Sequence, residues 1–409
     1  MTWASGQAMS RSRRLAIEGG EPLRSEFLPF GQPVLDETEI GHVADVLRSG
    51  WLGMGQRTLD FEKAFADFVG ARCAVAVSSC TAGLRMSLET AGVQPGDEVI
   101  TTPMTFAATV NVILAAGGVP VLADVDPLTL NLRPEAVEAA ITERTKVLMP
   151  VHFGGLPCDL TTLGALADRH GLKIVEDAAH AVGAEQAGVR VGGHGNLTAF
   201  SFYPNKNMTT IEGGMITTND EAAAEDLRLQ RLHGLSNDAW RRYNCQELIV
   251  SQVVRSGFKY NFTDVQAELG LSQLERLPGF LETRARQARR YDEELRGLPL
   301  RPQARPEVGG DRHALHLYVV LLDLDQLTVD RDTVVRALRA ENIGVGVHYL
   351  AIHEHPYFGA ELSYEKGDLP GAECVSARTL TLPLGPAMTD EDQELVLTAL
   401  RDVLGYYAA

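Results

Sequence analysis

Short apolar runs alternate with amphipathic segments over the first half of the chain. The runs lack regularly spaced polar positions, which is typical of strands covered on both faces. Between several of them apolar residues recur every three to four positions, which indicates helices. This alternation predicts a large three-layer αβα domain around a mostly parallel, seven-stranded sheet. The predicted strands are Ala74–Val77, Glu98–Thr101, Val119–Leu122, Lys146–Val151, Lys173–Glu176, Ala199–Phe202 and Met215–Thr218, and the helices between them include Thr81–Ala91, Thr105–Ala116, Pro134–Ile141 and Asp159–His170.

Two helices are predicted before the first strand. Asp36 would cap the first, which ends at Gly50, and Gly70 would end the second. Residues 1–30 are expected to form an extended arm, because glycines and prolines interrupt them.

The last third of the chain predicts a smaller α+β domain. A long helix over Asp264–Leu295, bent or broken near Pro278, would separate it from the large domain. We therefore expect an arm (residues 1–30), a large domain (31–265) and a small C-terminal domain (266–409). The small domain would contain strands His316–Leu322 and Gly344–Leu350 and helices Arg331–Ala340 and Thr389–Leu404.

Composition and charge narrow the class of protein. With 45% hydrophobic and 22% charged residues the chain has the composition of a soluble globular protein. Its net charge of −17 leaves no basic surplus to neutralise phosphates, so we expect no nucleic-acid partner. A local positive pocket for an anionic ligand is still compatible with that charge. The five cysteines form no C-x-x-C pair, which indicates neither a disulfide framework nor a zinc knuckle and favours the cytoplasm.

One apolar run, Phe106–Val125, is about as long as a membrane span. Asn111, Gly117–Gly118 and Pro120 interrupt it, so we interpret it as a buried helix followed by a buried strand. The arginines near the N-terminus precede no apolar segment. We therefore expect neither a transmembrane segment nor a secretory signal.

Candidate chemistry gathers at the carboxyl ends of the predicted strands, where α/β sheets bind ligands. Ser78–Thr81, Asp177 and Lys206 all fall there. Pyridoxal 5'-phosphate (PLP) requires a lysine for a Schiff base and an acid that keeps its pyridine nitrogen protonated. Taken singly, a loop lysine is most often solvated and an aspartate at a strand end most often caps a turn. The prediction of a PLP site depends on their convergence.

Other residues near this edge fit the same prediction, each with an ordinary alternative. Small hydroxyls and backbone N–H groups at Ser78–Ala82 could seat a phosphate, or simply cap a helix. Ser201 could add a hydroxyl to that phosphate or bond its neighbours in a strand. Phe106 could stack on a planar cofactor or belong to the core. His180 follows Asp177 by one helical turn, close enough to reach the hydroxyl of the cofactor ring.

We expect no metal site. His348, His353 and His355 are close in sequence, but they lack the carboxylate-and-histidine spacing of a helical metal site. The chain also has no P-loop, no G-x-S-x-G elbow and no dinucleotide-binding G-x-G-x-x-G after a strand.

With these residues assembled, the chain resembles the DegT/DnrJ/EryC1/StrS family of aminotransferases, which has the aspartate-aminotransferase-like fold (fold type I) of vitamin B6 enzymes. The resemblance runs from about Phe27 to the C-terminus. The stretch HGLSNDAW (His233–Trp240), together with FKYNFTD, is most similar to the branch that acts on nucleotide-linked 4-keto sugars. The motifs that carry the resemblance to the family are SSCTAGL (Ser78–Leu84), VEDAAHAVG (Val175–Gly183), FSFYPNKNMTTIEGG (Phe200–Gly214), FKYNFTDVQAELGLSQL (Phe258–Leu274) and GVHYLAIHEHPYF (Gly346–Phe358).

The resemblance implies a role for each matching residue. Lys206 would be the Schiff-base lysine and the acid/base that moves a proton between cofactor and substrate carbons. Asp177 would pair with the pyridinium nitrogen, His180 would lie near the ring hydroxyl, and Phe106 would stack on the ring. The other implied contacts are those of Thr81, Ala82 and Ser201 with the phosphate, of Asn261 with the phosphate of the neighbouring subunit in a homodimer, and of His348 and Tyr349 with the sugar nucleotide.

Two positions bear on how far the resemblance extends. Cys80 stands where many members have glycine, and we expect a slightly tighter turn there without loss of binding. Some relatives carry histidine in place of the lysine and dehydrate sugars, so Lys206 favours transamination.

The resemblance implies an aminotransferase that moves an amino group from an amino acid, glutamate first among the candidates, to a nucleotide-linked keto sugar of the 4-keto-6-deoxy or 4-keto pentose type. Three alternatives remain open from the sequence. They are a family member acting on a cyclitol ketone or aminobenzoate precursor, a fold-related decarboxylase or cysteine desulfurase, and a PLP-binding regulator without turnover. The residues of Ser236–Ser256 would help to shape the substrate pocket, but their composition does not identify the sugar.

Overall fold

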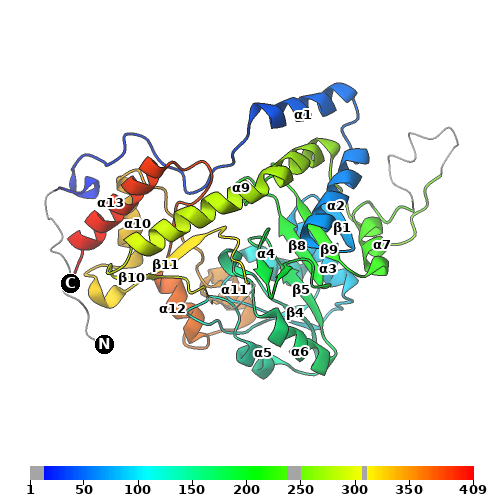
Figure 1. The fold of residues 1–409 in the computed structure, drawn as a ribbon. Helices are drawn as coiled ribbons and strands as arrows, with labels where there is room; N and C mark the ends of the chain where they lie inside the picture. Colours follow the sequence, from blue (N-terminus) through cyan, green and yellow to red (C-terminus); the bar gives the residue numbers. More distant parts are fainter. Residues whose placement is uncertain (1–12, 237–249, 306–310) are drawn as a thin grey trace.

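The computed structural model describes residues 13–236, 250–305 and 311–409. The motif His233–Trp240 and the segment Ser236–Ser256 therefore lie partly outside the described residues. Within residues 13–30 the chain forms a single turn of 3₁₀ helix, Ala16–Glu18 (η1), and otherwise has little regular structure (Figure 1), while Leu15 and Leu28 are buried against the C-terminal part.

Two amphipathic helices follow the arm and end where the sequence predicts. The side chain of Asp36 accepts a hydrogen bond from the backbone N–H of Glu39, and the Glu39 side chain accepts one from Asp36, which is a complete capping box. Gly50 and Gly70 end the helices in the left-handed region, with φ of 76° and 79°. The helices are α1 (Glu37–Ser49) and α2 (Gln56–Val69).

The large sheet has seven strands, as predicted, in the order β1-β9-β8-β5-β4-β2-β3. Strand β9 is antiparallel to both of its neighbours, and the other neighbouring pairs are parallel. The carboxyl ends of β1, β5 and β8 therefore lie at the same edge of the sheet. The strands are β1 (Cys73–Val77), β2 (Glu98–Thr101), β3 (Val119–Leu122), β4 (Thr145–Met149), β5 (Lys173–Asp177), β8 (Leu197–Ser201) and β9 (Gly214–Thr218), with a separate hairpin of β6 (Glu185–Gln186) and β7 (Val189–Arg190).

Helices cover both faces of this sheet, and the alternating side chains of β5 show how (Figure 1). Val175 packs in a cluster with residues of α3 and α4. Ile174 faces the other way and packs with residues of α5 and α6, while α2 and α9 cover the same face beside β8. The helices are α3 (Cys80–Thr90), α4 (Ala107–Ala115), α5 (Pro134–Ala140), α6 (Leu160–His170) and α7 (Glu221–Gln230), and η2 is a 3₁₀ turn at Phe153–Gly155.

Helix α9 (Asp264–Glu294) runs from the large sheet to the C-terminal part as one element of 31 residues (Figure 1). A break at Pro278 is therefore wrong, because the proline lies inside the helix. Proline removes only one backbone donor at its own position. The helix is held on both sides of it, by Leu274, Leu277 and Leu281 in the core of the large domain and by Tyr291 in that of the small one.

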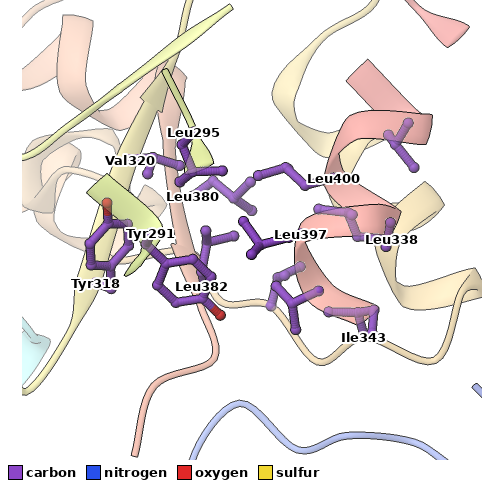
Figure 2. Close-up of a cluster of buried hydrophobic side chains, with 14 of the residues drawn as sticks. Tyr291, Leu295, Tyr318, Val320, Leu338, Ile343, Leu380, Leu382, Leu397 and Leu400 are labelled. Carbon is purple, nitrogen blue, oxygen red and sulfur yellow. The ribbon is translucent and has the colours of Figure 1, made fainter. Parts of the chain in front are cut away.

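The C-terminal part has its own core around an antiparallel sheet of order β10-β11-β12. Figure 2 shows Tyr291 of α9 and Leu295, which follows the helix, meeting Val320, Leu380, Leu397 and Leu400 in this core. The rings of Tyr291 and Tyr318 are 4.8 Å apart. Its elements are β10 (Leu300–Pro302), β11 (Tyr318–Leu322), β12 (Thr379–Leu382), α10 (Arg331–Ala340), α11 (Pro356–Leu362), α12 (Pro370–Arg378) and α13 (Asp390–Tyr406), with 3₁₀ turns η3 (Leu324–Gln326) and η4 (Ile352–Glu354).

The strand predicted over Gly344–Leu350 is wrong. This segment makes only isolated bridges, through Ile343 to Leu28 and through Gly346 to Thr381. Because its two flanking partners come from the arm and from β12, it runs between them and pairs continuously with neither. The segment crosses toward the edge of the large sheet and brings His348 and Tyr349 there.

The start of α9 also fixes the start of α2. The Asp264 carboxylate, which is 4% exposed, accepts hydrogen bonds from the backbone N–H groups of Gly55, Arg57 and Thr58 and from the Thr58 hydroxyl. These groups are the N-terminal donors that a helix leaves unsatisfied. Asp264 is therefore a cap supplied from a distant part of the chain.

We expect Asp264→Ala to lower the apparent free energy of unfolding by about 3 kcal/mol, because several buried donors would lose one charged acceptor. Denaturant unfolding followed by circular dichroism measures the loss. Asp67→Ala, which removes an exposed carboxylate from the same helix, is the control and should change stability by less than about 0.5 kcal/mol. Equal effects of the two substitutions would contradict the capping role.

No helix within the three described ranges is long and apolar enough to cross a membrane.

Candidate active site

The candidate residues meet at the carboxyl edge of the large sheet. Asp177 is the last residue of β5, Lys206 lies in the loop after β8, and α3 begins at Cys80 just after β1. The loops around Gly346–Phe358 approach the same edge from the small domain, where the backbone N–H of Ile352 bonds the carbonyl of Pro103 at 2.8 Å. The predicted convergence of Lys206 and Asp177 is present in the fold.

Lys206 is held by a loop that closes on itself between β8 and β9. The backbone of Phe202 bonds both ends of this loop, donating to Gly213 and accepting from Thr210. The Asn207 side chain ties the loop to the small-domain side by donating to the carbonyl of Ala314 at 2.8 Å. The Lys206 Nζ lies 3.5 Å from Nε2 of His316. Burial lowers the pKa of Lys206 to about 8, although the nearby Asp177 carboxylate opposes the shift.

Asp177 is 5% exposed and has a donor on each oxygen. Its Oδ2 accepts a hydrogen bond from the Thr109 hydroxyl at 2.8 Å, and its Oδ1 accepts one from the backbone N–H of Ala179 at 3.1 Å. The thiol of Cys80 lies 4.0 Å from Oδ1. Burial raises the pKa of Asp177, and the bonds from Thr109 and Ala179 and the charge of Lys206 oppose that rise. The Asp177 carboxylate can therefore accept one more hydrogen bond from a strong donor.

Residues on the other face of β5 fix the strand end that carries Asp177. His152 Nδ1 accepts the backbone N–H of Cys158 at 3.0 Å, so the ring proton is on Nε2, which faces Glu176 Oε2 at 2.9 Å. Asn196 donates to the other oxygen of Glu176 at 2.7 Å. The backbone N–H of His152 also bonds the carbonyl of Asp177 at 3.2 Å. This paired network, in which His152 and Glu176 are fully buried, leaves little freedom to the end of β5.

A cluster of neutral imidazoles lies beside Lys206. His180 Nδ1 accepts the backbone N–H of Gly154 at 3.3 Å, which places the ring proton on Nε2, and Nε2 lies 3.2 Å from the Tyr349 hydroxyl. The rings of His180 and His316 are 4.5 Å apart. Burial, followed by the charge of Lys206, lowers the pKa of both histidines well below the usual value. His180 therefore offers an N–H donor at the position where the sequence predicts a contact with the ring hydroxyl.

The aromatic residues that are predicted to contact the cofactor and the substrate lie beside this histidine cluster. Phe106 is the N-cap residue of α4 and is 64% exposed, which is unusual for a phenylalanine that has only a packing role. Its ring is 6.3 Å from that of Tyr349. His348 is held by a hydrogen bond between its Nδ1 and the Thr381 hydroxyl at 2.9 Å, and burial followed by the charge of Lys206 lowers its pKa to about 4.

The N-terminus of α3, Gly214 and Ser201 lie next to one another. Ser201 pairs with Gly214 across β8 and β9, and a Cβ at Gly214 would be 2.6 Å from the backbone nitrogen of Cys80. Only glycine permits this approach. Thr81 is exposed, whereas the Ala82 N–H donates to the Ser79 side chain at 3.1 Å. The capped N-terminus of α3 is therefore also the predicted phosphate-binding site, since the N-terminus of a helix attracts an anion.

Asn261 lies beside the end of β1, where it bridges Val77, and its side chain is bonded within its own loop to Lys259 and to the carbonyl of Phe262. Its predicted contact with the neighbouring subunit remains a prediction. Within the described ranges no group of three or more histidine, cysteine or acidic residues could hold a metal ion.

Two residues of this site were not singled out from the sequence. His316 was interpreted only as the start of a strand, and Thr109 as part of a helix. Neither carries a local signal, because His316 is brought to Lys206 by the small domain and Thr109 to Asp177 by the packing of α4 on the sheet.

The donor set suits PLP. A partly buried amine whose pKa is lowered to about 8, a buried carboxylate with an unused lone pair, an imidazole N–H and an exposed aromatic ring lie at the same edge of the sheet, beside a helix N-terminus. Cys80 fits the same arrangement, because its thiol turns away from the helix N-terminus toward the carbonyl of Ala199 at 3.5 Å.

Comparisons with known proteins show which family the chain is similar to. The model of the DegT/DnrJ/EryC1/StrS aminotransferase family matches residues 33–401. The spore coat polysaccharide biosynthesis protein SpsC of Bacillus subtilis (strain 168) is 46% identical over 383 residues, which are 93% of this chain and 98% of SpsC.

Solved structures are similar over the same length. The aminotransferase TlmJ from Streptoalloteichus hindustanus is 35% identical with a TM-score of 0.84, covering 93% of this chain and 99% of TlmJ. Spr1654 from Streptococcus pneumoniae in its PLP-form is 30% identical with a TM-score of 0.85, covering 92% of this chain and 98% of that structure.

Proposed function

The chain belongs to the DegT/DnrJ/EryC1/StrS aminotransferase family, and on that premise we propose that it uses PLP to transfer an amino group from glutamate to a keto sugar carried on a nucleotide. The observation that carries the proposal is the meeting of Lys206 and Asp177 at one sheet edge in a chain that is 46% identical to a polysaccharide biosynthesis protein. We further propose that the enzyme is a homodimer in which Asn261 reaches the phosphate of the partner's cofactor.

Each residue of the site would have one task. Asp177 would accept a hydrogen bond from the protonated pyridine nitrogen, His180 would donate to the ring hydroxyl, and Phe106 would stack on the ring. Thr81, Ala82 and Ser201 would bind the phosphate at the N-terminus of α3. When bound, PLP supplies an electron-accepting ring that stabilises negative charge on the reacting carbon.

Lys206 would then work as the proton carrier. Its Nζ would hold the cofactor at rest and would serve as a free amine during the reaction. A pKa of about 8 suits this task, because the amine can both take and return a proton near neutral pH. Glutamate and the keto sugar would use the same site in turn, which implies ping-pong kinetics. His348 and Tyr349 would contact the sugar nucleotide.

A substrate panel tests the proposal directly. The purified protein is incubated with PLP, glutamate and nucleotide-linked 4-keto and 3-keto sugars, and the amino sugar and 2-oxoglutarate are measured by mass spectrometry. We expect equal amounts of both products with at least one nucleotide-linked 4-keto sugar. Turnover with a cyclitol ketone alone would contradict the proposed substrate class, and no release of 2-oxoglutarate from glutamate would contradict the proposed donor.

The lowered pKa of Lys206 also predicts a pH dependence. Only the uncharged amine attacks an aldehyde, so the rate at which the cofactor-free protein takes up PLP covalently should rise roughly tenfold per pH unit below the pKa and level off above about 8. Stopped-flow absorbance measures this rate. A free lysine derivative, whose amine has a pKa of about 10.4, is the control and should keep accelerating through pH 10. The same continued rise in the protein would contradict a lowered pKa.

A further inference from the structure

Two buried threonine hydroxyls form a chain that ends on Asp177. The Thr105 Oγ1 lies 2.7 Å from the Thr109 Oγ1, which lies 2.8 Å from Asp177 Oδ2. Thr105 is 2% exposed and Thr109 is 0% exposed, so both hydroxyls are shielded from bulk water. Thr105 lies just before Phe106, the N-cap residue of α4, and Thr109 lies in the first turn of that helix.

The direction of each hydrogen bond between these hydroxyls follows from the carboxylate on which they end. A hydroxyl has one proton, and an ionised carboxylate only accepts. Thr109 must therefore donate to Asp177, and Thr105 must donate to Thr109. A chain of hydroxyls that all point the same way polarises each member, so Thr105 strengthens the bond that Thr109 makes.

The two hydrogen-bonded threonines also determine which oxygen of the Asp177 carboxylate can accept a further hydrogen bond. Ala179 and the more distant Cys80 thiol lie on the Oδ1 side. Thr109 uses one of the two lone pairs of Oδ2 and leaves the other for a donor in the site. Thr109 itself is fixed, since α4 packs through Val112 and Ile113 against the same sheet face as Asp177.

We propose that Thr109, supported by Thr105, is the positioning residue for Asp177, and that its hydroxyl keeps the carboxylate ionised and oriented toward the pyridine nitrogen of the cofactor. The inference rests on the proposed function, because it takes Asp177 as the partner of that nitrogen. The rise that burial imposes on the pKa of Asp177 makes such a donor necessary, and the Thr109 bond opposes that rise.

Binding of pyridoxamine 5'-phosphate to the cofactor-free protein tests the inference without turnover, because this probe lacks the aldehyde that would link to Lys206. Thr109→Val keeps the shape of the side chain and removes the donor. We expect its Kd to rise about tenfold, since hydrogen bonds to charged groups contribute more than neutral ones. Thr109→Ser restores the hydroxyl and should stay within about twofold of wild type, and Thr105→Val should raise the Kd about threefold.

Thr101→Val is the matched control. Thr101 is also 0% exposed and donates its hydroxyl to the carbonyl of Met149 at 2.8 Å, so its loss costs a buried hydrogen bond remote from the Asp177 carboxylate. Its Kd should stay within about twofold of wild type. In an Asp177→Asn background, Thr109→Val should change the Kd by less than about twofold, because its effect passes through the carboxylate.

The outcomes separate this inference from the function on which it rests. If wild type fails to bind pyridoxamine 5'-phosphate, the proposed cofactor is wrong. If wild type binds it and Thr109→Val matches Thr101→Val, or if Thr109→Val has its full effect beside Asp177→Asn, the positioning role alone is wrong. Should Thr109→Val fail to fold by circular dichroism, Thr105→Val decides the question, and an unchanged Kd for that variant overturns the proposal.

Discussion

Replacing Lys206 with alanine is expected to abolish amino transfer. The substitution removes the amine that would hold the cofactor covalently and the same amine that would carry the proton between substrate carbons. General acid–base catalysis alone contributes about 10²- to 10⁴-fold, and the covalent link adds to that, so we expect a loss of at least about 10⁴-fold. The cofactor contacts of Asp177, His180 and Phe106 would remain, so binding of pyridoxamine 5'-phosphate should survive.

The measurement has two parts. Release of 2-oxoglutarate from glutamate reports the reaction, and borohydride reduction of the PLP-loaded protein followed by peptide mapping reports which lysine held the cofactor. Lys173→Ala is the control, because Lys173 is exposed at the other end of the strand that carries Asp177 and should leave both readouts unchanged. A reduced adduct on another lysine, or full activity of Lys206→Ala, would overturn the proposed site.

The large domain could be predicted from the sequence because its signals are local. Most of the seven strands are buried on both faces, so apolar runs mark them, and β2 and β3 begin and end at the predicted residues. The helix ends follow from single residues such as Asp36, Gly50 and Gly70. Parallel strands that alternate with helices place their carboxyl ends together, and this topology alone brought Asp177 and Lys206 to one edge.

The parts that were missed depend on contacts between distant segments. Gly344–Leu350 has the apolar pattern of a strand, but its pairing partners lie on two different elements, and no property of the segment itself reports that. His316 reaches Lys206 only because the small domain folds against the large sheet, with the backbone N–H of Leu317 bonded to the carbonyl of Gly154. Thr109 is one of many buried threonines until Asp177 is seen beside it. A reactive residue at a strand end can be predicted from the sequence, whereas the residues that contact it are brought there by the packing of distant segments.

Among the residues whose surroundings come from packing, Asp177 is expected to affect the rate of amino transfer the most after Lys206. Asp177→Asn is expected to lower the rate of amino transfer roughly 10²- to 10³-fold while the cofactor still binds. Asparagine has nearly the same shape and could still meet the Thr109 hydroxyl and the Ala179 N–H. It lacks the negative charge that would keep a proton on the pyridine nitrogen, so the ring would withdraw electrons less strongly from the reacting carbon.

Single-turnover release of 2-oxoglutarate from PLP-loaded protein measures this loss apart from product release. Asp220→Asn is the matched control. Asp220 caps α7 after the antiparallel strand β9 and therefore lies at the opposite edge of the sheet, and asparagine caps a helix as well as aspartate does. We expect its rate to equal that of wild type. A rate for Asp177→Asn within about threefold of wild type, at saturating PLP, would mean that the charge at the end of β5 does not act on the cofactor, because a charge in contact with a reacting ring in a buried site has an effect well above that size.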